Sequence, residues 1–354
     1  MPNSIITATG SYIPPRKITN DFFLNHDFYN TDGNKLERTN SEIVNKLLEI
    51  TGIKERRYAA DDQTTSDIAG IAAEKALENF DRESLDYIIV AQNMGEVTAE
   101  NNRIDIVPTI ASRVKHKLGI KNPYTVCFDL PFGCPGWLQG IIMADYFIKS
   151  GDAKHILVIG AEILSRVSDP HDIDSMIFAD GAGATLIEAT DQCSGVMCHV
   201  TRSDTSKEAY LLRMGPSNNP NRRKGNDLFI KMDGHLIYKY AVRTVPLVIK
   251  KNLDKAGLHL KDVNKVLIHQ ANEKMDMAIV KRLFKLYDIE KINPDIMPMI
   301  ICWSGNSSVA TLPTLLDLIN RKKLESHNLI SGNIIVFASV GAGMNINSMV
   351  YRVP

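Results

Sequence analysis

The chain has 354 residues, of which 44% are hydrophobic and 23% charged, the composition of an ordinary globular protein. Lysine plus arginine and aspartate plus glutamate each total 41, so no chain-wide attraction to nucleic acid or anionic membrane is expected. No apolar run approaches the roughly 18 to 20 residues that span a bilayer, and the N-terminus lacks the pattern of a signal peptide.

The hydrophobic pattern alternates short β-rich runs with longer amphipathic stretches, which is typical of an α/β protein. The expected strands are Ile5–Thr9, Tyr87–Gln92, Tyr124–Leu130, His155–Gly160, Ala184–Glu188, Lys265–His269, Ile334–Ser339 and Ile346–Arg352. The expected helices are Ser66–Phe80, Ile106–Lys117, Gly136–Lys149, His235–Ala256, Glu273–Tyr287 and Val309–Arg321. Ser66 is expected to cap its helix, and Pro246 is expected to kink or split the helix that contains it.

The two parts of the chain share one layout of strand, helix, strand, turn, helix, strand, which indicates a duplicated α/β unit. In the second part, the apolar run MPMIIC (297–302) takes the place of the middle strand. We expect two halves, residues 1–187 and 188–354, with a junction near Ile187–Cys193. The polar, asparagine-rich residues 20–45 are expected to form a surface insertion or lid.

The cysteine count is five, an odd number scattered in mostly apolar surroundings. This usage argues against a disulfide framework and predicts a reducing compartment, the cytoplasm. Cys193, Cys198 and His199 lack a partner pair at zinc-site spacing, so no metal site is expected.

Cys134 lies in DLPFGCPGWLQG, directly after an expected strand and directly before an expected helix. A cysteine at a helix N-terminus faces free backbone N–H groups and the positive end of the helix dipole, which favour the thiolate. Gly133 and Gly136 permit the sharp turn, and Pro135 suits the first helical turn. A small buried cysteine remains the alternative interpretation.

Two further polar residues follow the ends of expected elements in the second half. His269 ends the strand KVLIH, where sites of α/β proteins gather, although a strand-end histidine satisfied by backbone contacts is the alternative. Asn306 lies in the turn that corresponds to the Cys134 turn, where its amide could donate to an oxyanion or simply cap a helix. If the halves pack about a pseudo-twofold axis, Cys134, His269 and Asn306 face one central crevice.

These motifs together resemble the β-ketoacyl-acyl-carrier-protein synthase III family: Cys134 in an elbow, HQAN at His269–Asn272 and GNSS at Gly305–Ser308. The resemblance extends over nearly the whole chain and includes ATGSYIP, TGIKERR (Thr51–Arg57) and IFADGAGA (Ile177–Ala184). It implies the thiolase fold, a five-layered αβαβα arrangement of two duplicated halves, usually as a homodimer.

The resemblance also implies an acyltransferase that performs a decarboxylative Claisen condensation of an acyl thioester with a malonyl-type carrier-bound extender, giving a 3-oxoacyl product without a cofactor. Cys134 is then the nucleophile, and His269 with Asn306 form one oxyanion hole. The N–H groups of Cys134 and Ala342 form the second. The implied partners are acyl carrier protein and coenzyme A thioesters, and the positions that match the carrier-docking patch are Lys239, Lys274, Lys281 and Arg282.

The sequence departs from the primary fatty-acid enzymes at three positions. Lys46 and Ile50 stand where those enzymes have a Trp and an Arg that sandwich the adenine of coenzyme A, which argues against a coenzyme A primer. Val107 stands where a Phe shortens the partner subunit's acyl pocket, so the smaller side chain predicts medium or longer acyl chains. Head-to-head condensing relatives have a Glu there, which argues against that chemistry.

Three alternatives stay open. The first is a specialised-metabolite ketosynthase, of the dialkylresorcinol or polyene lipid type, that acts on longer acyl chains. The second is a cysteine-dependent acyltransferase that forms no carbon–carbon bond, although that chemistry does not need both His269 and Asn306. The third is a non-catalytic subunit of a condensing heterodimer, a class that usually lacks the cysteine retained at position 134.

Overall fold

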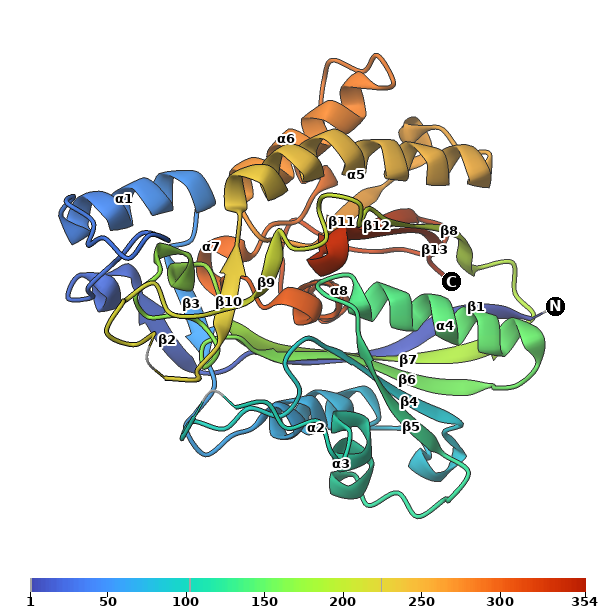
Figure 1. Cartoon of the computed structure of the whole chain (residues 1–354). Helices are drawn as coiled ribbons and strands as arrows, with labels where there is room; N and C mark the ends of the chain where they lie inside the picture. The colour runs from blue at the N-terminus through green and yellow to red at the C-terminus, as the bar shows by residue number, and fades with distance from the viewer. Residues whose placement is uncertain (1, 102, 224) are drawn as a thin grey trace.

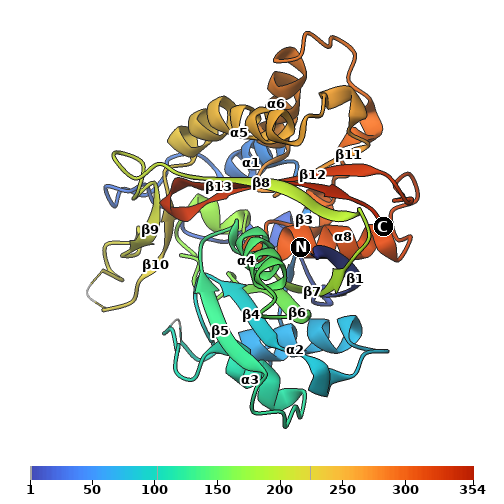
Figure 2. The same ribbon diagram turned by 90° about the vertical axis from the view of Figure 1, so that its right-hand side faces the viewer.

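Two central sheets separate three layers of helices in the computed structural model, which describes residues 2–101, 103–223 and 225–354 (Figures 1 and 2). From one face to the other, the layers are helices, a sheet, helices, a second sheet and helices. The predicted α/β class and five-layered αβαβα arrangement are therefore confirmed. Each layer boundary buries apolar side chains, as a stable layered fold requires.

The first sheet has the strand order β1, β7, β6, β4, β5. Its strands are β1 (Asn3–Tyr12), β4 (Tyr87–Gln92), β5 (Val126–Pro131), β6 (His155–Ile163) and β7 (Asp180–Thr190). Strand β4 runs parallel to both β5 and β6, so the carboxyl ends of these three strands meet at one edge. Helices α2 (Thr65–Ala76) and α3 (Ile110–Lys117) cover the outer face of this sheet.

The second sheet has the order β11, β12, β13, β8 and repeats the first without a counterpart of β5 among the described residues. Its strands are β8 (Gly195–Ser203), β11 (Lys265–Ile268), β12 (Ile334–Gly341) and β13 (Asn345–Arg352). Helices α5 (Gly234–Ala256) and α6 (Glu273–Lys285) cover its outer face, and α4 (Gly136–Ser150) and α8 (Thr311–Asn320) lie between the sheets. The predicted duplication is visible in this correspondence.

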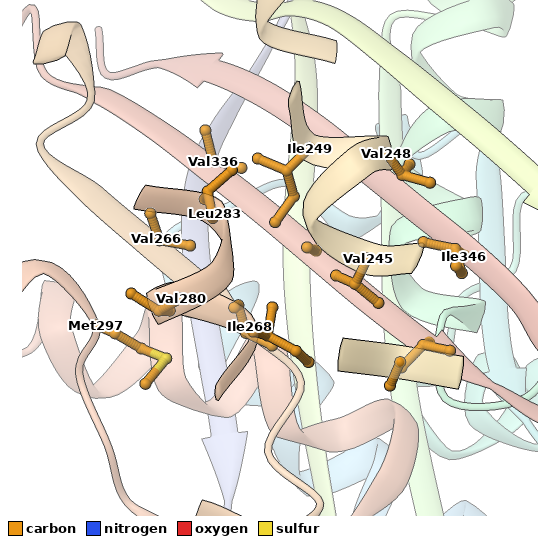
Figure 3. Close-up of a cluster of buried hydrophobic side chains, with 14 of the residues drawn as sticks. Val245, Val248, Ile249, Val266, Ile268, Val280, Leu283, Met297, Val336 and Ile346 are labelled. Carbon is orange, nitrogen blue, oxygen red and sulfur yellow. The ribbon is translucent and has the colours of Figure 1, made fainter. Parts of the chain in front are cut away.

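The cores follow from the apolar runs of the strands, which are buried on both faces. Figure 3 shows the outer core of the second half, where side chains of α5 and α6 pack onto the second sheet. Val245 and Ile249 from α5 and Leu283 from α6 meet Val266 and Val336 from the sheet there. In the middle layer, the buried Trp137 ring packs near Phe337, with ring centroids 5.8 Å apart.

Smaller elements lie around the two halves. They are β2 (Arg16–Thr19), which pairs with β3 (Glu55–Tyr58), β9 (Leu212–Gly215), which pairs with β10 (Phe229–Met232), α1 (Asn40–Thr51) and α7 (Ile301–Ser304). The asparagine-rich segment 20–45 is a packed surface element rather than a loose lid. Phe23 and Phe28 within it are buried, and Thr39 forms a capping box with Glu42 at the start of α1.

Two local predictions are wrong, and one of two alternatives for Pro246 is excluded. Thr64, and not Ser66, caps α2, because Asp67 binds the Thr64 N–H while both donors of Ser66 bind the Glu96 carboxylate. Helix α5 is continuous through Pro246, which excludes the predicted split, while the alternative of a kink stays a prediction. Residues 297–302 form no strand: the segment ends in the short helix α7.

The division into halves at residues 187 and 188 stays a prediction, and it falls within β7. Among the described residues, no helix has the length and apolar character needed to cross a membrane.

Candidate active site

One cavity of about 270 Å³ brings together Cys134, His269 and Asn306, which are far apart in the sequence. Cys134 comes from the first half, and His269 and Asn306 come from the second. The cavity lies where the N-terminus of α4 meets the ends of β11 and β12, which is the convergence expected from the duplicated layout.

The Cys134 elbow depends on two glycines at a close approach of the two halves. A Cβ on Gly341 would lie 2.5 Å from the Cys134 backbone nitrogen, and one on Gly133 would lie 2.8 Å from that of Ala342. Gly133 also has a φ of +69°, which disfavours other residues. The turn at residues 341 and 342 therefore touches the cysteine elbow directly, and Ala342 lines the cavity.

His269 directly follows β11, and its backbone N–H donates to Ala338 at 2.9 Å. The side chain is buried, and its Nδ1 has no hydrogen-bond partner among the described residues. Burial lowers the pKa of His269 to about 4. The ring is therefore a neutral imidazole at physiological pH, able to donate one hydrogen bond but not to carry a positive charge.

Asn306 is held by the backbone of the first half. Its N–H donates to Ile177 at 3.0 Å, and its carbonyl accepts from Ala179 at 2.8 Å. The side-chain Oδ1 accepts from the Ser308 N–H at 2.9 Å, so this oxygen is occupied and Nδ2 is the part of the amide left to donate.

Gly305 gives Asn306 its approach to this backbone, with a φ of +70°. A Cβ at Gly305 would lie 2.6 Å from the Cβ of Arg56, which is itself almost fully buried. The Arg56 guanidinium donates to the carbonyls of Met176 and Ile18. Arg56 of the TGIKERR motif therefore packs against the turn that carries Asn306.

The cysteine is not ionised at rest. Removal from bulk water raises the pKa of the Cys134 thiol to about 11, and a hydrogen bond from Ser308 Oγ to Sγ, 3.3 Å long, acts in the opposite direction. The position before α4 favours a thiolate, as the sequence predicts, but desolvation is the larger effect.

The remaining wall is mostly apolar and rich in methionine. The methionines that line it are Met94, Met214, Met232, Met275 and Met344. Methionine is unbranched and flexible, so such a wall adapts to apolar ligands of different shape. A flexible hydrocarbon chain fits this environment better than a polar substrate.

The other predicted site residues lie outside this cavity. Val107 is 77% exposed and does not line the cavity, although Ile104, three residues earlier, does. Lys281 and Arg282 line a groove between α5 and α6, Lys239 lines a second groove beside α5, and Lys274 is exposed in the first turn of α6. Lys46 pairs with Glu49 on the surface of α1, and Ile50 is 37% exposed.

The sequence predicted no individual role for three polar residues that lead away from Cys134, although Ser308 ends the GNSS motif. Ser308 contacts the thiol, Asn93 contacts Ser308, and Glu162 contacts Asn93. A signal for two of them was present, because Asn93 directly follows β4 and Glu162 lies near the end of β6, at the carboxyl edge of the parallel strands.

Comparisons with known proteins agree with this geometry. Residues 128–205 match the family described as 3-oxoacyl-[acyl-carrier-protein] synthase III, and residues 253–353 match its C-terminal part. The chain is 31% identical to β-ketoacyl-[acyl-carrier-protein] synthase III of Thiobacillus denitrificans, over 99% of this chain and 100% of that protein. It is 33% identical to the enzyme of the same name from Clostridium acetobutylicum, over 99% of both chains.

Solved structures give the same result. The 3-oxoacyl-[acyl-carrier-protein] synthase III of Aquifex aeolicus superimposes with a TM-score of 0.81 at 29% identity, covering 99% of both chains. The priming β-ketosynthase of the R1128 polyketide pathway has the same TM-score at 24% identity, covering 99% of this chain and 96% of that one, which shows the shared fold. The chain belongs to the β-ketoacyl-[acyl-carrier-protein] synthase III family of thiolase-fold acyltransferases, which catalyse decarboxylative Claisen condensation.

Proposed function

We propose that this chain condenses an acyl group on Cys134 with a malonyl-type extender on acyl carrier protein to give a 3-oxoacyl product. The observation that carries the proposal is the convergence of Cys134, His269 and Asn306 on one mostly apolar cavity. The names of its relatives, which specify synthesis on acyl carrier protein, support the same assignment.

In the first half reaction, the Cys134 sulfur attacks the carbonyl carbon of an acyl thioester. A carbon–sulfur bond forms at Cys134, the bond to the donor sulfur breaks, and the thiol proton leaves with the donor thiol. The N–H groups of Cys134 and Ala342 would stabilise the oxyanion of the tetrahedral intermediate. The contact between residues 341–342 and the cysteine elbow supports this pairing.

In the second half reaction, the malonyl group loses carbon dioxide and leaves an enolate. We assign its oxygen to His269 and Asn306, since the neutral imidazole and the Asn306 Nδ2 can both donate. The enolate carbon then attacks the acyl group, the bond to Cys134 breaks, and the sulfur leaves as a thiolate that takes up a proton. A neutral histidine suits this role because it stabilises the enolate without protonating it.

We further propose a homodimer formed through the edge of the first sheet. Strand β5 is one of the two edge strands of this sheet, and Val126 in it and Tyr124 before it are 48% and 85% exposed. An uncovered edge strand with apolar side chains is a surface that proteins normally protect. The exposed Val107 would then reach the partner's acyl pocket, where its small side chain leaves room for medium or longer chains.

The carrier-docking patch is proposed on the grooves of α5 and α6. Lys281, Arg282 and Lys239 line these grooves, together with the basic residues Lys285 and Arg243. The resemblance suggests an acidic carrier protein, which such a rim would attract. We propose a cytoplasmic location, supported by five cysteines that form no disulfide.

Mass spectrometry of the intact protein tests the proposal. The protein is incubated with acyl thioesters of increasing chain length, on coenzyme A and on acyl carrier protein, and the modified peptide is then located. We expect an acyl adduct on the peptide that contains Cys134, with medium or longer chains accepted. An exclusive preference for acetyl would overturn the assignment of Val107, and absence of any adduct at Cys134 would overturn the function.

A further inference from the structure

A line of polar contacts runs from the cysteine into the first sheet. Ser308 Oγ contacts Cys134 Sγ at 3.3 Å, and Asn93 Nδ2 contacts Ser308 Oγ at 2.9 Å. Asn93 in turn donates to Glu162 Oε2 from its backbone N–H, at 3.0 Å, and from its side-chain amide. Neither Asn93 nor Glu162 is used by the mechanism derived above.

The direction of these hydrogen bonds is fixed by their chemistry. Asn93 Nδ2 can only donate, so Ser308 Oγ must accept from it. A serine hydroxyl has a single proton, and the Ser308 proton is therefore free to point at the Cys134 sulfur. A donor at this place stabilises the thiolate more than the thiol.

Ser308 is held in an unusual backbone conformation at this position. Its φ is +51°, in the left-handed region that residues other than glycine seldom adopt, and its N–H donates to Asn306 Oδ1. Glycine would suit this backbone better. The hydroxyl that contacts the Cys134 sulfur is what glycine would lack at this position.

Glu162 anchors the other end of the line. Its side chain is fully buried, and its Oε1 has no hydrogen-bond partner among the described residues. Burial raises the pKa of Glu162 to about 8, and its negative charge raises the pKa of Cys134. The buried Asp180 on β7 acts on Glu162 in the same direction, while the neutral His269 supplies no compensating charge.

We propose that Glu162, Asn93 and Ser308 are positioning residues, in which Glu162 fixes the Asn93 amide and Asn93 directs the Ser308 proton onto the Cys134 sulfur. The inference rests on the proposed nucleophilic role of Cys134. No proton is transferred along the line: the hydroxyl proton stays on Ser308 while the sulfur gains and loses its acyl group. The contribution is greatest in the steps in which negative charge develops on the Cys134 sulfur, when the thiol attacks the thioester and when the sulfur leaves the acyl group.

The test measures how the alkylation of Cys134 by iodoacetamide depends on pH, read from the Cys134 peptide by mass spectrometry. We expect Ser308→Gly and Asn93→Ala to raise the pH midpoint by about one unit, which is a tenfold loss of thiolate at a given pH. Glu162→Gln removes a nearby charge and keeps an acceptor for the Asn93 N–H, so its midpoint should fall. Ser308→Gly suits the left-handed backbone, so its effect reports the lost hydroxyl rather than strain.

Ser175→Ala is the matched control, because Ser175 is a buried serine whose hydroxyl donates to the Asp172 carbonyl, away from the cavity. Its midpoint should equal that of the unmodified chain. If the Ser308→Gly and Asn93→Ala midpoints also remain within about 0.2 units, the inference is overturned. Alkylation needs no thioester substrate, so this result is independent of whether Cys134 accepts an acyl group.

Discussion

The side chain of Gln270 accepts a hydrogen bond from the Ile300 backbone N–H at 2.9 Å. The same oxygen accepts from Ile301 at 3.0 Å, and Nε2 donates to the Pro298 carbonyl at 2.7 Å. Gln270 directly follows His269, and the segment that it binds leads through α7 to Asn306. The buried side-chain amide of Gln270 therefore links two segments by hydrogen bonds. One carries His269 and the other leads to Asn306, the two proposed donors to the enolate.

Replacing Gln270 with alanine should remove the hydrogen bonds that hold these two segments together. Gln270→Ala leaves buried backbone groups without partners, so we expect a loss of about 2 to 4 kcal/mol in the free energy of unfolding, measured with urea. Malonyl decarboxylation should fall more than acylation of Cys134. Gln192→Ala, at an exposed site, is the control. Equal losses in both half reactions would argue against this role of Gln270.

Gly341→Ala should damage the proposed oxyanion hole at Cys134, because the new Cβ would lie 2.5 Å from the Cys134 nitrogen. We expect acylation to slow by about 100-fold or more, the scale for losing one such donor, as measured by single-turnover mass spectrometry. Gly234→Ala is the matched control, since no atom lies within 4 Å of its added Cβ. An acylation rate within about twofold of the original chain would contradict the assignment.

The protonation of His269 should not lower the decarboxylation rate near pH 6.5, the ordinary pKa of histidine. Burial lowers the pKa of His269 to about 4, so the neutral imidazole, which can stabilise the enolate without protonating it, persists as the pH falls through 6 and is lost only near 4. Decarboxylation of a malonyl thioester, followed as carbon dioxide release, should therefore show no loss around pH 6.5 from this residue. If the decarboxylation rate of the original chain falls as the pH drops through 6.5, and this fall is absent in His269→Asn, the His269 ring is more solvated than the structure indicates.

Asp276 should make the protein less stable as the pH rises. Its carboxyl group is fully buried on α6, neither side-chain oxygen has a partner among the described residues, and burial raises its pKa well above the ordinary value. The folded state thus retains a proton that the unfolded state loses above about pH 4, so stability falls with rising pH from there.

Asp276→Asn should remove this pH dependence and raise the melting temperature at pH 8 relative to the original chain. Thermal unfolding between pH 5 and 8 measures the effect. Asp254→Asn is the control, because Asp254 is an exposed carboxylate paired with Lys250. A melting temperature that falls equally at every pH for Asp276→Asn would contradict the prediction.

Charge reversal at Lys281 and Arg282 should selectively weaken the binding of substrates attached to the carrier protein. We expect the double change to Glu to raise KM for an acyl-carrier thioester by about tenfold or more, and to leave KM for a small thioester within about twofold. The effect should shrink as salt is added. Lys121→Glu, on the exposed surface of the first half, is the control. A similar rise for both substrates would place the carrier elsewhere.

Much of the fold could be predicted from sequence because its strands are continuous apolar runs. Tyr87–Gln92 was predicted with its observed bounds, and the elbow at Cys134 was found because two glycines and a proline mark it. The run at 297–302 is also apolar but forms no strand: Pro298 has no N–H for a strand ladder, and the Gln270 side chain binds the Pro298 carbonyl and the Ile300 N–H. The hydrophobic pattern of a short segment does not reveal a hydrogen-bond partner that lies far away in the sequence.

The site was predicted less completely than the fold. Cys134, His269 and Asn306 stand in recognisable motifs, whereas Asn93 and Glu162 are single polar residues whose importance depends on contacts across the sheet. The protonation states also could not be read from sequence. The helix N-terminus suggested a thiolate, but burial, which needs the three-dimensional structure, raises the pKa of Cys134.

The most direct test of the account separates the two half reactions in three variants. Cys134→Ala should show no acyl adduct by intact mass, while His269→Ala and Asn306→Ala should still acquire the adduct but release no carbon dioxide from a malonyl thioester. Loss of the adduct in the Asn306 variant, or undiminished carbon dioxide release in either second-half variant, would contradict the division of roles between the two halves.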